Sequence, residues 1–172
     1  MLSYCGQNYG AGNTERVKKG VKDALLIAFI VYIVCAGGGL LLTIGGTYMK
    51  IFYSDEKISA EAIRYGNAYL YCDLTLYYLL GVLFVLRNSL QGIEKSLFPL
   101  VAGVGELIAR TVLCLLLPAA LNHGPIDINA GTSALLGLTF ADPLAWAAAC
   151  AVLLFGTFKY IFKAKQNKRP HM

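Results

Sequence analysis

Four long apolar stretches, separated by short charged connections, occupy most of this 172-residue chain. The first, from Ala24 to Met49, runs for 26 residues without a charged side chain. An α-helix needs roughly 20 apolar residues to cross a hydrocarbon layer of about 30 Å. A soluble protein has no use for such a run, because its helices are apolar along one stripe only. The sequence therefore predicts an all-α membrane protein, a bundle of four transmembrane helices.

The composition and the charge support the membrane assignment. The chain is 57% hydrophobic and carries a formal net charge of +5. Its basic residues flank the apolar stretches and form no separate basic domain, so membrane topology explains them better than nucleic-acid binding does. We therefore expect the lipid bilayer as a partner, and no nucleic acid.

The apolar stretches divide the chain into three predicted parts. Residues 1–22 are expected to form a cytoplasmic connecting segment, and residues 165–172 a basic cytoplasmic tail. Between them, residues 23–164 form the predicted four-helix transmembrane region. Its spans are expected at about residues 23–48, 62–86, 96–121 and 142–162.

Local signals mark the first and fourth spans. Five glycines between positions 37 and 46 should make the second half of the first span deformable. The fourth span is expected to begin with Asp142 as its N-terminal cap and Pro143 in its first turn. The stretch from Asn122 to Ala141 starts with turn-forming residues, which predicts an external loop.

Lysine and arginine are distributed unevenly over the predicted connections. Eleven lie on the side that contains the N-terminal segment, the second connection and the C-terminal tail, and three lie on the other side. Cytoplasmic loops of membrane proteins retain an excess of positive charge. Both termini are therefore predicted to be cytoplasmic, in a multi-pass protein of the cell membrane.

Three charged side chains lie deep inside the predicted spans, where charge is costly and commonly functional: Asp73, Glu106 and Arg110. Glu106 and Arg110 are four residues apart with the acid first, which places them on one helix face as an ion pair. The interpretation we favour is a self-neutralised pair that fixes helix packing. A role in transport is the alternative.

The second span contains Asp73 and several tyrosines. Asp73 has no basic residue within four positions, and removal from water would favour its neutral form, which is the condition for proton or sodium exchange. A hydrated carboxylate near the outer interface is the alternative. Tyr65 and Tyr69 are expected to anchor the helix at the interface. Tyr77 and Tyr78 lie deeper and can either anchor the helix or line a cavity for a flat organic cation.

No catalytic, cofactor or metal motif is recognisable in the sequence. The five cysteines are dispersed at roughly one per span, so we interpret them as small packing residues and not as zinc ligands or disulfide partners. His123 has no ligand partner at helical spacing, and no serine, cysteine and histidine arrangement indicates hydrolysis. We expect no enzymatic activity, no cofactor and no metal.

Three segments resemble, in the same order, the C-terminal half of multidrug and toxic compound extrusion (MATE) transporters. The resemblance covers about Ser3 to Lys163, and members of this family have twelve transmembrane helices in two lobes. It implies that the chain corresponds to the last four helices of such a transporter and that the N-terminal lobe is a missing partner. The segments are GQNYGAGNTERVKKGVKDAL, LRNSLQGIEKSLFPLVAGVGELIARTVL and FADPLAWAAACAVLLF.

The resemblance implies a fragment of a multidrug efflux antiporter, which exports organic, often cationic, drug-like compounds in exchange for protons or sodium by alternating access. Some bacterial members carry cation-binding carboxylates in helices seven and ten. Asp73 lies on the helix that matches helix ten, nearer its start than the family acid, and is a candidate for ion coupling. Tyr77, Glu106 and Arg110 complete the candidate ion-coupling or cavity residues. A complete four-span transporter working as a homodimer is the alternative, although the strong charge bias predicts a single orientation.

Overall fold

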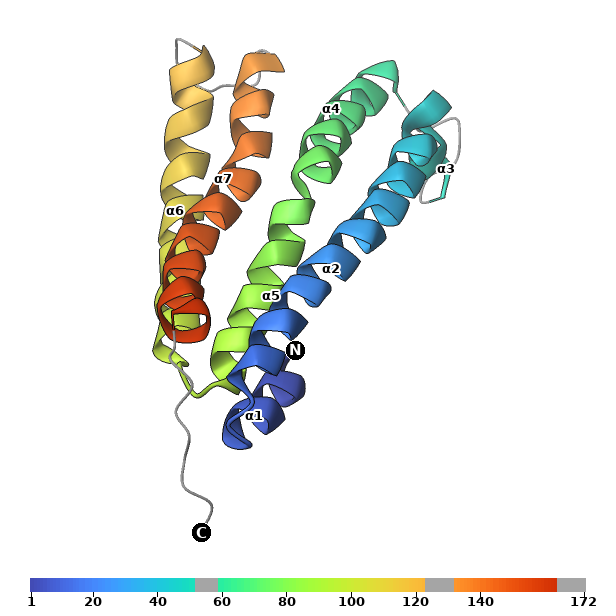
Figure 1. The fold of residues 1–172 in the computed structure, drawn as a ribbon. Helices are drawn as coiled ribbons and strands as arrows, with labels where there is room; N and C mark the ends of the chain where they lie inside the picture. The colour runs from blue at the N-terminus through green and yellow to red at the C-terminus, as the bar shows by residue number, and fades with distance from the viewer. Residues whose placement is uncertain (52–58, 123–131, 164–172) are drawn as a thin grey trace.

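The computed structural model describes residues 1–51, 59–122 and 132–163, and all secondary structure in this part of the chain is helical (Figure 1). A short helix at the N-terminus precedes the long apolar helices, and two of these are interrupted. The elements in chain order are α1 (Leu2–Gly10), α2 (Thr14–Thr43), a 3₁₀ turn η1 (Ile44–Gly46), α3 (Thr47–Lys50), α4 (Ala60–Leu76), α5 (Tyr78–Gly92), α6 (Leu97–Asn122), α7 (Thr132–Thr157) and a π-helical turn η3 (Phe158–Phe162).

Three helical segments of the described part are long and apolar enough to cross a membrane: Thr14–Lys50, Leu97–Asn122 and Thr132–Phe162. The pair α4 and α5 meets at an angle of 44° and supplies a fourth span if the bent pair is counted as one. Helix α6 begins and ends within one residue of the predicted third span. The all-helical membrane class is confirmed, and the number of complete crossings depends on the bent pair.

The first predicted span lies within a longer helical segment, which extends beyond it at the N-terminal end. Helix α2 begins at Thr14 and includes the basic residues up to Lys22, because a helix can continue in water after its apolar part ends. At the other end, the helix breaks in the glycine-rich segment. Gly45 and Gly46 have φ angles of 64° and 68°, a conformation that glycine adopts at little cost.

The second predicted span is interrupted at Tyr77, where the sequence contains neither proline nor glycine. The carbonyl oxygen of Thr75 accepts a hydrogen bond of 2.7 Å from the hydroxyl of Tyr32 on α2. The Thr75 hydroxyl in turn donates to the carbonyl of Tyr71 at 2.5 Å. Side chains that bind helix carbonyls in this way are a recognised cause of kinks. The bend therefore depends on a partner from another helix.

The predicted start of the fourth span at Asp142 is wrong, because α7 already covers Thr132–Thr157 and both Asp142 and Pro143 lie inside it. The external loop predicted up to Ala141 is consequently wrong from Thr132 onward. Asp142 forms an ion pair instead of capping a helix. Neighbouring helices can compensate the backbone hydrogen bond that an internal proline removes. The rest of the predicted loop, with His123, and the predicted tail lie outside the described residues.

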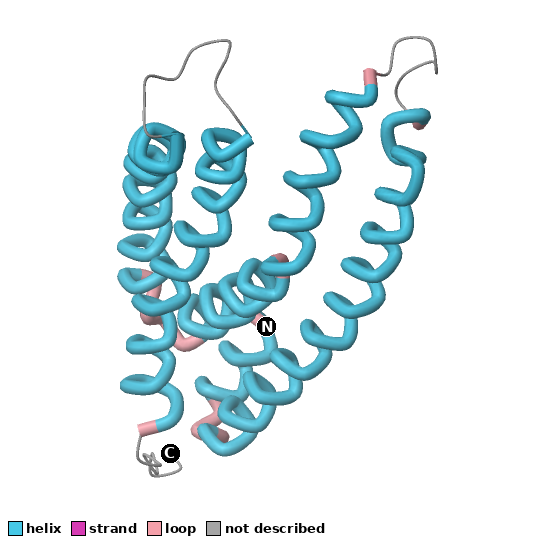
Figure 2. The backbone as a smooth tube through the Cα atoms, turned by 90° about the horizontal axis from the view of Figure 1, so that it is seen from above, coloured by secondary structure: helices cyan, strands magenta, loops and turns pink. Residues whose placement is uncertain are grey.

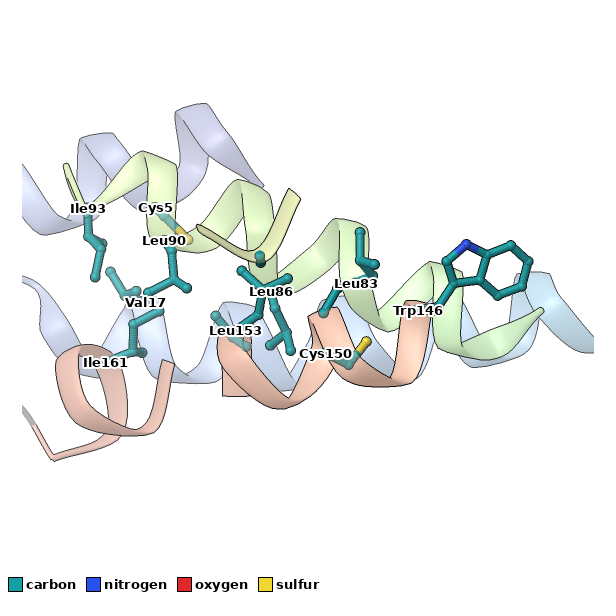
Figure 3. Packing of buried hydrophobic residues seen from close by; sticks show 13 residues of the cluster. Cys5, Val17, Leu83, Leu86, Leu90, Ile93, Trp146, Cys150, Leu153 and Ile161 are labelled. Carbon is teal, nitrogen blue, oxygen red and sulfur yellow. The ribbon is translucent and has the colours of Figure 1, made fainter. Parts of the chain in front are cut away.

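The helices form two hairpins, α2 with α4–α5 and α6 with α7, which lie closest at the lower end of Figure 1 and diverge toward the upper end (Figures 1 and 2). Helix α7 packs against both α5 and α6. Most of the buried apolar side chains gather at the lower end, where α1, α2, α5, α7 and η3 meet (Figure 3). Prominent members of this core are Cys5, Val17, Leu83, Leu86, Leu90, Ile93, Leu153 and Ile161.

Small residues let α7 approach its neighbours closely. Ala141, Ala145 and Ala149 recur every four residues on its buried face. At Gly137, an added Cβ atom would lie 2.7 Å from the carbonyl carbon of Leu117 on α6. In contrast, only 6% of the most apolar window is buried in α2 and in α6, against 44% in α7. Helix α7 is therefore the internal helix, and α2 and α6 present apolar surface outward.

The first and last described helices meet at one end of the bundle. Val17 near the start of α2 and Ile161 in η3 are both buried in the same core cluster. The chain therefore returns, at residue 163, to the end from which it started. This agrees with the predicted placement of both termini on one side of a membrane, and the identity of that side stays a prediction.

Candidate functional site

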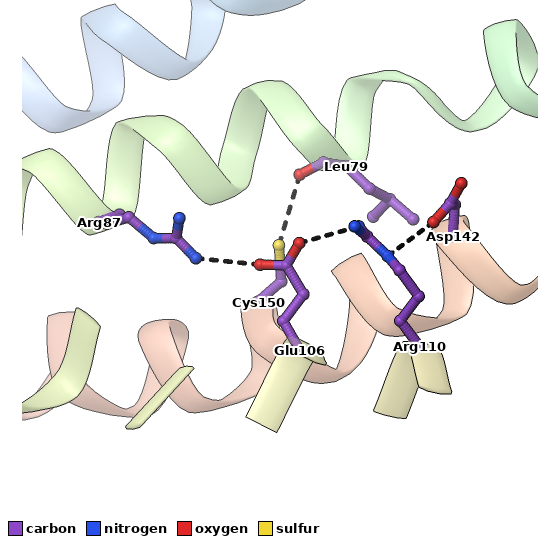
Figure 4. A network of polar contacts seen from close by, with 6 residues as sticks. All are labelled: Leu79, Arg87, Glu106, Arg110, Asp142 and Cys150. Carbon is purple, nitrogen blue, oxygen red and sulfur yellow. Dashed lines mark hydrogen bonds and ion pairs between the residues drawn. The ribbon is translucent and has the colours of Figure 1, made fainter. Parts of the chain in front are cut away.

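The predicted ion pair between Glu106 and Arg110 is present, and it belongs to a longer chain of charges (Figure 4). Arg110 Nη2 donates to Glu106 Oε1 at 3.1 Å. Arg87 Nη2 on α5 donates to the other oxygen of Glu106 at 3.0 Å. Arg110 Nε lies 2.7 Å from Asp142 Oδ1 on α7, at an angle that makes the contact an ion pair and not a hydrogen bond. Four alternating charges thus connect three helices.

The order of these charges limits their cost in the membrane. Arg87, Glu106, Arg110 and Asp142 sum to zero, and each acid lies beside at least one guanidinium group. A charge removed from water is tolerated only when it is paired and hydrogen-bonded. This arrangement supports the packing interpretation of the Glu106–Arg110 pair.

The two halves of the charge chain, Arg87 with Glu106 and Arg110 with Asp142, differ in exposure. The side chain of Glu106 is 16% exposed, whereas those of Arg110 and Asp142 are 41% and 33% exposed. Beside Glu106, the thiol of Cys150 donates to the carbonyl of Leu79 at 3.4 Å and closes this end toward α5 (Figure 4). The charge chain is therefore largely shielded from water at Glu106 and partly exposed at Arg110 and Asp142, which we call its open end.

Asp73 on α4 lies at the open end of the charge chain. Its Oδ1 atom is buried and has no hydrogen-bond partner among the described residues. Asp73 and Asp142 lie close enough for their carboxylates to repel each other, and Tyr69 lies within electrostatic reach of both acids and of Arg110. We call this group, Tyr69, Asp73, Arg110 and Asp142, the central polar face.

The tyrosines of the bent pair point to different partners. The Tyr77 ring is edge-on to Trp146 of α7, with centroids 6.0 Å apart, and its side chain is exposed. Tyr78 faces α2 instead, where its ring contacts Phe29 and its hydroxyl donates to the carbonyl of Leu25 at 3.3 Å. Tyr77 therefore stays a candidate cavity residue, whereas Tyr78 is engaged in helix packing.

Two members of the charge chain were assigned otherwise from the sequence. Arg87 was counted as a loop charge and Asp142 as a helix cap, yet both lie inside helices and pair with the charges of α6. The available signal was their position at the ends of long apolar runs with no charge of opposite sign nearby. Asn67, on the same helix as Asp73, also has a buried side-chain oxygen without a hydrogen-bond partner in the described part.

Two carboxylates, those of Asp73 and Asp142, share the partly exposed site of the central polar face. Among the described residues, no group of three or more histidine, cysteine, aspartate or glutamate side chains could hold a metal ion. Of the five cysteines, Cys5 and Cys150 are buried, Cys72 and Cys114 are partly buried, and Cys35 is exposed. All five are free thiols.

The apolar helices and the buried charges between them define a multi-pass helical membrane protein. The family model described as MatE matches residues 1–116, which is about two thirds of the chain. The chain belongs to this family, whose members are membrane transporters and not enzymes. No curated protein and no solved structure matches it. The matched region contains Asp73, Glu106 and Arg110, whereas Asp142 and α7 lie beyond it.

Proposed function

We propose that this chain is the C-terminal part of a multidrug efflux antiporter and corresponds to its last four helices. The transporter exports organic, often cationic, compounds in exchange for protons or sodium, and its two lobes alternate access to a central cavity. Family membership supports transport in general. The proposed ion coupling, hinge positions and orientation rest on the charges and on the geometry of the helices.

The observation that carries the ion-coupling proposal is the unpaired, buried oxygen of Asp73 beside the Arg110–Asp142 pair. Asp142 has a guanidinium partner, but Asp73 has none among the described ion pairs. A carboxylate without a fixed partner at membrane depth is suited to bind and release a proton or sodium ion. Asp73 is therefore the proposed coupling residue, and Arg110 pairs with Asp142 beside it.

Two interruptions supply the flexibility that alternating access requires. The α4–α5 bend at Tyr77 and the glycine break at Gly45 and Gly46 divide their spans into shorter rigid segments. Hinge positions of this kind absorb the change in backbone angles during a transition. Tyr77 lies at the bend with its ring exposed and edge-on to the buried Trp146, where it can contact a flat cation.

The proposed orientation places the end that contains α1 in the cytoplasm of the cell. Lys22, Lys95 and Lys159 all lie near η3 at this end. Excess positive charge is retained on the cytoplasmic side. A C-terminal fusion to green fluorescent protein, compared with one to alkaline phosphatase, tests the orientation, and activity of the phosphatase alone would contradict it.

The first test of the proposal is the coding DNA upstream of Met1. An in-frame continuation that encodes eight further apolar spans is the expected result. Ion-driven export of ethidium should then require the whole transporter and be absent from cells that express this chain alone. Vigorous ion-coupled export by the chain alone, together with a defined crosslinked dimer, would favour a homodimeric four-span transporter instead.

The second test addresses Asp73 in the whole transporter. Asp73→Asn should reduce ion-driven ethidium export at least tenfold, because the amide cannot bind and release the coupling ion. Asp23→Asn is the matched control, since Asp23 is exposed near the start of α2 and outside the charge chain, and it should leave export within twofold. Undiminished export by Asp73→Asn at wild-type protein levels would disprove the coupling role.

A further inference from the structure

The end of the bundle that contains α1 and η3 has a group of lysines that the proposed transport function does not use. These lysines come from α2, from the turn between α5 and α6, and from η3 and the residue after it. Each ammonium group lies over an aromatic ring. The pairs are Lys22 with Phe162 at 5.8 Å, Lys95 with Tyr160 at 5.1 Å, Lys159 with Tyr160 at 5.2 Å, and Lys163 with Phe158 at 5.1 Å. We call these four lysines the basic collar.

Two of the ammonium groups share one ring. Lys95 and Lys159 both lie within 5.2 Å of the Tyr160 centroid, so their nitrogen atoms are no more than about 10 Å apart. Neither lysine forms an ion pair with a carboxylate in the described part of the chain, and Glu94, the neighbour of Lys95, also has none there. Two cations at this separation repel each other. An anion between them would remove that cost.

Backbone hydrogen bonds fix the two segments that carry Lys95 and Lys159. The amide of Lys95 donates to the carbonyl of Leu90 at 2.9 Å, and Glu94 has a φ of 64°, which together form the motif that closes the C-terminal end of α5. On the other side, the amide of Lys163 donates to the carbonyl of Phe158 at 2.9 Å in the wide turn of η3. Ordered cations lose less entropy when they bind an anion.

Apolar surface continues directly from the collar along α7. Phe155 and Phe158 each lie beneath a collar lysine, and their side chains are 64% and 56% exposed. The preceding Leu154 is also exposed. A ligand for this surface needs an anionic head and an apolar body. Inorganic phosphate would leave the apolar part uncovered, whereas a phospholipid of the adjacent leaflet would cover both parts.

We infer that the basic collar binds the headgroup of an anionic phospholipid, with the phosphate between Lys95 and Lys159 and the acyl chains along Phe155 and Phe158. Clusters of lysine at the cytoplasmic ends of transmembrane helices are attracted to the anionic lipid of the adjacent leaflet. The charge bias that sets orientation requires only net charge on one side. In addition to net charge, the basic collar holds its lysines at defined positions, with Lys95 and Lys159 paired at the Tyr160 ring.

The test uses the purified full chain in uncharged detergent. The probes are a short-chain phosphatidylglycerol, the phosphatidylcholine of the same chain length, and inorganic phosphate. Phosphatidylglycerol should bind saturably and at least tenfold more tightly than phosphatidylcholine, and phosphate should not displace it. Equal affinity for the two lipids, or displacement by phosphate at the concentration of the lipid, would overturn the assignment.

Variants locate the site. The double variant Lys95→Gln/Lys159→Gln should lose at least tenfold in affinity for phosphatidylglycerol, whereas Lys95→Arg/Lys159→Arg should retain it. The matched control is Arg16→Gln/Lys19→Gln, which removes the same charge at two exposed positions of α2 outside the collar and should stay within twofold of wild type. Equal loss in the control and the glutamine variant would reduce the effect to net charge and refute a defined site.

Folding of the variants is checked by circular dichroism and by elution as a single species. If the glutamine variant does not fold, the proposal is tested by the salt dependence of phosphatidylglycerol binding to the wild-type chain. Affinity for phosphatidylglycerol should fall at least tenfold between low and high ionic strength, because salt screens the ammonium groups at the exposed end of the bundle. Binding that is insensitive to salt would refute headgroup recognition by the collar.

Discussion

The Nε atom of Arg110 lies 2.7 Å from Oδ1 of Asp142 and joins α6 to α7 inside their apolar spans. The Glu106–Arg110 pair is therefore not closed on itself, because Arg110 also serves an acid on the next helix. Arg87 extends the connection to α5 through Glu106. The four charges act as one clamp: loss of Glu106 leaves Arg87 without an ion-pair partner in the described part of the chain, and loss of Arg110 does the same to Asp142.

Glu106 is the member of the clamp whose loss should cost most. Glu106→Gln leaves Arg87 and Arg110 without the carboxylate that they share, in the most buried part of the charge chain. Loss of one partner from a desolvated pair should lower the free energy of unfolding by about 2–3 kcal/mol. Thermal unfolding of the purified chain in detergent measures this effect.

The matched control for Glu106 is Glu61→Gln on α4. Glu61 lies 3.8 Å from Arg64 in a pair whose side chains are 70% and 61% exposed. Exposed pairs of this kind contribute little, so the change should stay below about 0.5 kcal/mol. Equal destabilisation by the two substitutions would contradict the clamp.

The closest backbone approach of α6 and α7 predicts a second effect. Gly137→Ala places a methyl group 2.7 Å from backbone atoms of Leu117 and Pro118, which cannot move as a flexible side chain would. The helices must separate, at a cost of about 1–3 kcal/mol. Gly105→Ala on α6 is the control, because no heavy atom lies within 4 Å of its added methyl group. The control should be neutral or slightly stabilising in the same unfolding measurement.

The break after α2 predicts that glycine is required at two positions and not at their neighbours. Gly45→Ala and Gly46→Ala force an alanine into positive φ, which costs roughly 1–2 kcal/mol per position. At Gly46 the added methyl group also meets Ile63 at 3.0 Å. Gly38→Ala, within α2 and with open space around it, should be tolerated. A destabilisation by Gly38→Ala as large as that by Gly45→Ala would show that helix packing, and not backbone angle, selects these glycines.

Cys5 on α1 predicts slow thiol chemistry. Its side chain is fully buried beside Gly92 of α5, and burial raises the pKa of the Cys5 thiol above the ordinary value of 9.0. At pH 7.5, a water-soluble maleimide should label Cys5 at least tenfold more slowly than a thiol introduced by Gln7→Cys, which is exposed on the same helix. Site-resolved mass spectrometry measures both rates.

The same thiol predicts the sign of a pH effect on stability. The unfolded chain releases the Cys5 proton near pH 9, whereas the folded chain retains it to higher pH. Ionisation therefore favours the unfolded state, so this contribution to stability is constant below about pH 8 and is lost as the pH rises through 9. Cys5→Ser should flatten this loss at alkaline pH. An unchanged alkaline profile in Cys5→Ser would assign the loss to other groups.

The membrane class and the third span could be predicted because they depend on local properties. Helix α6 is continuously apolar, so its length follows from the composition of its own segment. The Glu106–Arg110 contact was predictable for the same reason, since spacing along one helix determines it. The glycine break at Gly45 and Gly46 was also signalled locally, by the only residue that readily adopts positive φ.

The bend at Tyr77 and the true extent of α7 could not be read from their own segments. The carbonyl of Thr75 is bound by Tyr32, which lies 43 positions earlier in the chain. Asp142 followed by proline is a valid helix start in water, but here its carboxylate finds Arg110 on another helix. Local rules predicted the wrong outcome where a distant partner offered a stronger interaction.

Apolarity, charge spacing and glycine placement determined by themselves that this chain forms membrane helices, approximately where they run and which charges could meet on one helix. Only the tertiary structure decided that Arg87 and Asp142 complete the charge chain, that Asp73 lies beside it and that Lys95 and Lys159, from two segments, meet at Tyr160. The physical reason is range. Hydrophobicity and backbone preference act within a segment, whereas the pairing of buried charges is settled between segments that only folding brings together.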